Sequence, residues 1–141
     1  MKRGFTLLEL LLVLAVTGIL MSIAMPQLSQ AWDRVQVEAA ASHLVAAHQR
    51  ARIMAIARGL TLTLTIDSSA LTITPRSEAI ALWAGPGPSL FDVSFGGPAR
   101  HITFSPEGFT LGLSNASLHL VRGSATRTVV FSRLGRVKVV R

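Results

Sequence analysis

The sequence predicts an α+β protein in which one long N-terminal helix packs against a mostly antiparallel β-sheet. Two observations predict the helix: residues 5–25 are a largely apolar run with one charged member, Glu9, and residues 26–58 keep apolar side chains at steps of three and four. A third observation predicts the sheet, because the hydrophobic period changes to two after Gly59. A chain of 141 residues has room for one globular domain of this kind.

Residues 5–25 form the transmembrane half of the predicted helix. A helix of these 21 residues would be about 31 Å long, which matches a hydrocarbon core of roughly 30 Å. Lys2 and Arg3 precede the run and keep the N-terminus in the cytoplasm by the positive-inside rule, so the rest of the chain lies outside it. A secretory signal peptide is the alternative, since residues 22–24 offer a small-x-small cleavage site. The run is longer than the usual apolar region of about 7 to 15 residues, which favours an anchor.

Glu9 is the one charged residue within this apolar run. An acidic side chain inside a membrane span costs about 2.5 to 3.5 kcal/mol on insertion scales, so Glu9 calls for a cationic partner. The alternative is a carboxylate that snorkels by itself to the interface.

Residues 26–58 form the second half of the helix, outside the membrane. Pro26 has no N–H and clashes with the carbonyl of Ser22, at a cost of about 3 kcal/mol, so we expect a bend or local melting there. Beyond it, nine alanines and the absence of Gly and Pro favour a helix up to Arg58. Gly59 provides the C-terminal stop.

Residues 59–141 form the predicted β-rich globular domain. Leucine and isoleucine alternate with threonine over residues 60–66, which is typical of a half-buried strand. Residues 83–100 are rich in Gly and Pro and are predicted to be a long surface loop with at most a short strand at 91–95. A turn is expected at Leu134-Gly135. Further strands are expected at 71–74, 102–104, 117–121, 127–132 and 137–140.

The composition excludes several classes of enzyme site. The chain has no cysteine, which removes disulfides, Cys-ligated zinc, iron–sulfur clusters and thiol nucleophiles. His43 and His48 are five residues apart, not the four that place two zinc ligands on one helix face. No Gly-x-Ser-x-Gly frame and no phosphate-binding loop before a helix is present. We therefore predict no catalytic residue, no metal and no cofactor, and a plain surface or interface role for each histidine.

Positive charge concentrates at the C-terminal end of the chain. The net charge is +7, and six cations follow Glu107 with no acidic residue among them. Four of the six lie close together, namely Arg133, Arg136, Lys138 and Arg141. Arginine binds phosphate with two hydrogen bonds at once, so this basic surface is a candidate for sequence-independent, salt-sensitive DNA binding. The alternative is an ordinary solvated strand surface.

Residues 2–11, Lys-Arg-Gly-Phe-Thr-Leu-Leu-Glu-Leu-Leu, resemble the class III signal of type IV prepilins and pseudopilins. The resemblance implies that residues 1–4 are a leader, that a prepilin peptidase cuts between Gly4 and Phe5, and that the new amino terminus is methylated. An α-amino group titrates near pH 7.7 to 8 and is charged near neutrality, so it could pair with Glu9 of a neighbouring subunit. Such a pair would set the register of assembly, since a misplaced subunit leaves two unpaired charges in lipid.

The later part of the chain is similar to the GspH/FimT family. The similarity rests on residues 44–64, where an Ala-Arg-rich helix end runs into a Thr-rich strand, and on residues 102–141. In FimT-type minor pilins a C-terminal Gly-Arg-x-Arg turn is associated with DNA uptake. Arg136 matches its first cation, and Lys138 replaces the second, which keeps the charge and loses the fork.

These resemblances imply a non-enzymatic minor pilin or pseudopilin. Expected partners are other pilins, met through the N-terminal helix and its assembly residues Glu9 and Pro26, the prepilin peptidase, the inner-membrane assembly platform and DNA. The expected location is a single pass through the inner membrane with a periplasmic C-terminal domain, followed by incorporation into a type IV pilus. A type II secretion pseudopilin is the alternative, and an anchored periplasmic enzyme is a distant third.

Overall fold

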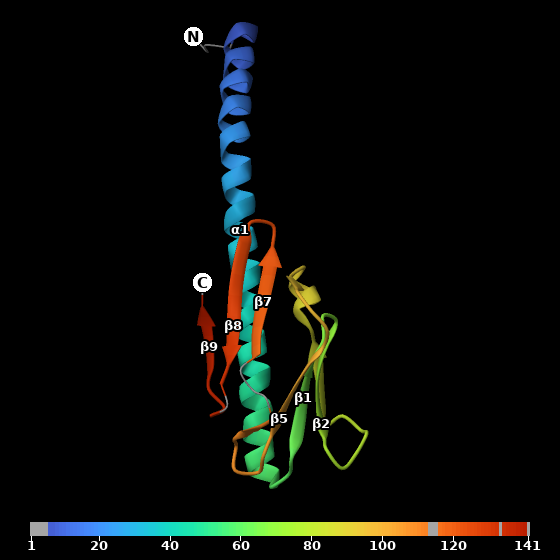
Figure 1. Ribbon diagram of the computed structural model, residues 1–141. Coiled ribbons are helices and arrows are strands. Elements are labelled where there is room, and N and C mark those ends of the chain that lie inside the picture. The colour runs from blue at the N-terminus through green and yellow to red at the C-terminus, as the bar shows by residue number, and fades with distance from the viewer. Residues whose placement is uncertain (1–5, 113–115, 133, 141) are drawn as a thin grey trace. The chain divides into compact units, whose positions relative to one another are not determined.

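The computed structural model describes residues 6–112, 116–132 and 134–140. The chain forms two compact units, the first ending at Trp32 and the second beginning at Asp33. The helix α1 (Leu7–Arg58) begins in the first unit and ends in the second. Figure 1 shows α1 and the strands of the second unit.

The first unit is the N-terminal half of α1. Thr6 caps this helix, because the backbone N–H of Glu9 donates to Thr6 Oγ1 at 3.2 Å. Residues 6–32 are exposed throughout. The helix continues without a break through Pro26, so the local melting expected there does not occur. Proline removes one bond from a long ladder, and the hydrogen bonds on either side keep the helix intact.

The second half of α1 ends where the sequence predicts. Gly59 adopts the left-handed conformation with φ 61°. The N–H groups of Gly59 and Leu60 donate to the carbonyls of Ile56 and Ala55 at 3.3 and 3.2 Å, which satisfies the last helical carbonyls. One face of this half is buried and consists mainly of alanine: Val37, Ala40, Ala41, Leu44, Ala47, His48, Ala51 and Ala55.

The first sheet has the strand order β3-β2-β1-β5-β6, and its neighbours are all antiparallel. In β1 the side chains of Leu62, Leu64 and Ile66 are fully buried. The threonines between them face the other way, and Thr63 shares a hydrogen bond of 3.1 Å with Thr103. The predicted alternation is therefore confirmed. The strands are β1 (Leu62–Ile66), β2 (Ala70–Pro75), β3 (Trp83–Pro86), β5 (Arg100–Phe104) and β6 (Thr110–Leu111).

The second sheet has the order β4-β7-β8-β9 and is also antiparallel. The predicted turn joins β8 to β9, with the N–H of Gly135 donating to the Ser132 carbonyl at 3.0 Å. Strands of both sheets lie along the second half of α1 (Figure 1) and bury it in one hydrophobic cluster. The elements are the 3-10 turn η1 (Pro88–Phe91), β4 (Ser94–Phe95), β7 (Ala116–Arg122), β8 (Ala125–Phe131) and β9 (Val137–Val140).

The fold class is thus confirmed, with its strands divided between two sheets. The expectation of a surface loop over residues 83–100 was wrong for its first part, which forms β3. This strand lies at the sheet edge, where Gly85 and Pro86 are tolerated because one side needs no ladder hydrogen bonds. Gly85 also makes room for the Trp83 ring, since a Cβ at Gly85 would lie 2.5 Å from it.

Each histidine is expected from the sequence to lie at the surface or at an interface. His48 of α1 departs from this expectation. Its side chain is fully buried, and its ring lies 5.0 Å from the Phe104 ring and 5.1 Å from the Phe131 ring. Neither ring nitrogen has a hydrogen-bond partner among the residues that the structure describes. Burial lowers the pKa of His48 from 6.5 to about 4, and the nearby Arg52 charge adds to this effect.

We expect the stability of the chain to fall in mild acid because of His48. His48 takes up a proton near pH 6.5 in the unfolded chain but only near pH 4 in the folded chain. The contribution of neutral His48 to the free energy of unfolding is therefore fully present above pH 6.5 and is lost as the pH falls toward 4. The full effect is about 3 kcal/mol. His48→Leu removes this dependence and raises stability at neutral pH, because two unpaired polar atoms disappear.

Urea unfolding of the full-length chain in detergent at several pH values measures both effects. His119→Gln, at an exposed position, is the control, and an unchanged pH slope in His48→Leu would contradict the assignment.

Candidate assembly helix and nucleic-acid interface

The N-terminal half of α1 has the properties of a helix surrounded by lipid. The helix is long and apolar enough to cross a membrane, and its most apolar window buries no residue within the structure. The two hydroxyl groups within residues 7–25 are satisfied internally. Thr17 Oγ1 donates to the Val13 carbonyl, and Ser22 Oγ donates to the Ile19 carbonyl, both at 2.7 Å. Apart from Glu9, residues 7–25 therefore present no polar side chain without an internal hydrogen bond to a hydrocarbon environment.

Glu9 is the exception within this segment. It lies in the first turn of α1, three residues after the capping Thr6, and is exposed. Over the part of the chain that the structure describes, its carboxylate has no ion-pair partner. The first turn is the positive end of the helix dipole, which lowers the cost of a carboxylate there by a fraction of a kcal/mol. The predicted processing residues Gly4 and Phe5 lie outside the described residues.

Two of the six C-terminal cations are neutralised by carboxylates of α1. Arg122 Nε lies 3.0 Å from Asp33 Oδ1, and Arg127 Nε lies 2.9 Å from Glu38 Oε2. Each pair joins residues 89 positions apart in the chain. The expected basic surface is consequently smaller than the sequence indicates, because these arginines tie the second sheet to the helix.

The remaining described cations lie at the start of β9. Arg136 and Lys138 are exposed, and no ion pair involves either of them in residues 6–112, 116–132 and 134–140. Both line an open hollow of about 480 Å³ together with side chains of β8. Gly135, with φ 69°, forms the turn beside them. The other two predicted DNA contacts, Arg133 and Arg141, lie outside the described residues.

The turn that carries Arg136 is fixed from the helix. Arg52 Nε donates to the Gly108 carbonyl at 3.0 Å. A Cβ at Gly135 would lie 2.9 Å from the same carbonyl, so the two turns are in close contact and only glycine fits there. The basic end of β9 is therefore held rigidly on the second unit.

Two protein-family models match the chain. Residues 1–25 match the model of the prokaryotic N-terminal methylation motif, and residues 40–135 match the model of the type II transport protein GspH. The chain belongs to the GspH family. This GspH-family chain is 31% identical to the pilin-like protein PilA1 of Thermus thermophilus, with 98% of each chain covered.

The fold of the GspH-family chain is that of a type IV minor pilin. It matches two crystal structures of the minor pilin FimU from Pseudomonas aeruginosa with TM-scores of 0.61 and 0.59, at 18% and 20% identity. The matches cover 77% and 74% of this chain, and 90% and 92% of the FimU chains. The chain is therefore a membrane-anchored minor pilin or pseudopilin, a structural subunit of a type IV pilus or a type II secretion system.

Proposed function

We propose that this chain is a minor subunit of a type IV pilus. A prepilin peptidase removes residues 1–4, the N-terminus of the mature chain faces the cytoplasm, and the second unit lies in the periplasm. The inner-membrane assembly platform then moves the subunit into the filament. The observation that carries this proposal is the exposed apolar half of α1, whose single carboxylate, Glu9, lies near its N-terminal end.

The position of Glu9 supports a role in assembly. Within the described chain the carboxylate has no cationic partner, although a charge in lipid needs one. The amino group of a cleaved Phe5 in a neighbouring subunit supplies that charge. A slip by one helical turn would leave both charges unpaired in a medium of low dielectric constant, so the pair selects one register.

We propose in addition that the start of β9 contacts DNA without sequence preference. The support is the pair of exposed cations, Arg136 and Lys138, on an edge strand beside an open hollow. Arg136 and Lys138 form no ion pair in the described chain, whereas Arg122 and Arg127 do. Arg133 and Arg141 would extend this surface.

A type II secretion pseudopilin is the second candidate. The match of residues 40–135 to GspH favours it, because that match covers most of the second unit. The two roles are separated by deleting the coding sequence and measuring surface pili, DNA uptake and protein secretion in the same strain. Loss of secretion with normal pili would overturn the pilus role.

The proposed cleavage by a prepilin peptidase determines the N-terminus of the mature chain. The mature chain begins at Phe5 and carries a methyl group on its amine. Intact mass measurement of the purified membrane form tests this expectation. A chain that begins at Met25 would instead indicate an ordinary signal peptidase, and the role proposed for Glu9 would fall with it.

Glu9→Gln is expected to leave processing and membrane insertion unchanged but to lower incorporation into filaments at least tenfold, because the charge that sets the register is gone. The variant keeps a side chain that suits the first turn of a helix, which separates charge from capping. Sheared filament fractions are compared by immunoblot with the membrane pool. Thr6→Ala, which removes the cap and keeps the carboxylate, is the control. Equal recovery of Glu9→Gln and wild type would refute the assembly role.

DNA binding by the mature chain in a zwitterionic detergent is expected to be weak and to fall steeply with salt. Each phosphate contact contributes about 0.9 to the slope of log affinity against log salt concentration, so Arg136→Gln with Lys138→Gln should lower the slope by roughly two. Folding should be unaffected, since exposed charges contribute little to stability.

Arg76→Gln, in the exposed turn after β2, is the matched control for this double variant. Fluorescence anisotropy with a labelled duplex at several salt concentrations gives the slopes. Absence of binding by wild type at low salt, or an equal loss in the control, would show that the start of β9 is ordinary solvated surface.

A further inference from the structure

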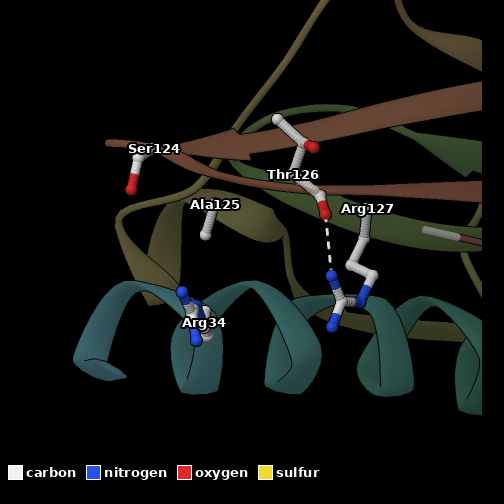
Figure 2. A pocket seen from close by; sticks show the side chains of 5 residues that line it. All are labelled: Arg34, Ser124, Ala125, Thr126 and Arg127. Carbon is white, nitrogen blue, oxygen red and sulfur yellow. Dashed lines mark hydrogen bonds between the residues drawn. The ribbon is translucent and has the colours of Figure 1, made fainter. Parts of the chain in front are cut away.

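A second hollow lies at the other end of β8, between α1 and the β7–β8 hairpin. It has a volume of about 390 Å³ and is lined by Arg34, Ser124, Ala125, Thr126 and Arg127. Figure 2 shows the Ser124 hydroxyl and the Ala125 methyl group directed toward α1, from which Arg34 projects. Two arginines and a hydroxyl group thus meet in one place, far along β8 from Arg136.

The two arginines of this hollow differ in how they are held. Arg127 is fixed, because its guanidinium donates to Glu38 Oε2 and to the Thr126 carbonyl, both at 2.9 Å (Figure 2 shows the second bond). Arg34 is exposed and has no ion-pair partner among the residues described.

The carboxylates beside the hollow are already engaged. Asp33 and Asp92 both lie within ion-pair distance of Arg122, and Glu38 pairs with Arg127, so Arg34 is the arginine beside the hollow that has no ion pair in the described chain. The hollow therefore suits an anion that accepts hydrogen bonds from a guanidinium and a hydroxyl group, as a phosphate does.

The place of Arg34 in the chain indicates where that phosphate comes from. Arg34 follows the predicted membrane span by only nine residues along the chain. Trp32, two residues earlier, is 55% exposed, and tryptophan is enriched at membrane–water interfaces. These features favour a lipid headgroup over a soluble anion.

We propose that the hollow between Arg34 and the β7–β8 hairpin binds the phosphate of an anionic phospholipid in the leaflet that this unit faces. Arg34 supplies a guanidinium that has no ion pair in the described chain, Ser124 donates a hydrogen bond, and Arg127 provides a second guanidinium that is held in place. The contact holds the second unit at the membrane surface while the subunit waits for assembly. This inference rests on membrane anchoring and is independent of DNA binding by β9.

Native mass spectrometry of the full-length chain in detergent tests the proposal. The protein is offered phosphatidylglycerol or phosphatidylcholine with identical acyl chains, and bound lipid is counted. Wild type is expected to prefer phosphatidylglycerol about fivefold, and Arg34→Gln to abolish this preference, because one basic residue near a membrane surface contributes about that factor. Arg34→Lys should retain most of it. Arg58→Gln, at another exposed arginine of α1, should behave as wild type.

Three outcomes would overturn the proposal. Wild type could retain both lipids equally, or Arg34→Gln could keep the full preference. In the third outcome, Arg34→Gln would leave the lipid preference intact. It would instead reduce the stabilisation of the protein by added inorganic phosphate, or the slope of log affinity for duplex DNA against log salt concentration. That result would assign the hollow to free phosphate or to the DNA surface.

Discussion

One helix must satisfy two environments, and the rest of the structure depends on this constraint. The side chains of residues 6–32 point outward with no protein around them, whereas the face of residues 37–55 is covered by two sheets. The two parts of the helix differ in the size of their apolar side chains. Leucine and valine dominate the first half, and alanines at Ala40, Ala41, Ala47 and Ala51 dominate the buried face of the second. Small side chains let strands approach the helix backbone closely, so two sheets can share one narrow face.

The features that were predictable from the sequence are local ones. The apolar run, the alternation of threonine with leucine in β1, and the glycines at 59 and 135 each depend on a few neighbouring residues. Period, helix stops and turns follow from backbone sterics and from burial on one face. Glu9 was recognisable for the same reason, because a charge within an apolar run conflicts with its immediate surroundings.

The features that could not be predicted depend on contacts between distant segments. The strand β3 contains Gly85 and Pro86 and forms because Ile73 and its neighbours in β2 offer an edge. The rings of Phe104 and Phe131 enclose His48. Its spacing from Leu44 and Ala51 places it on the apolar face of the helix, but the helix does not indicate which distant rings cover it. The charge pattern was misleading in the same way. The sequence alone places Arg122 and Arg127 in a basic surface. In the structure, Asp33 and Glu38 of α1 pair with these two arginines.

The contact of His48 with Phe131 has a consequence for biosynthesis. The ribosome makes the helix first, and the strands that cover its alanine face include β8, which is among the last elements to be made. At 5 to 20 residues per second, the 76 positions between Ala55 and Phe131 take roughly 4 to 15 s to translate. During that interval the apolar face of the nascent helix can pack on the strands of the first sheet, but the part that β8 covers has no partner from its own chain. The core around His48 therefore closes in two stages, on the first sheet and then on the final hairpin, and stays open to water on one side between them.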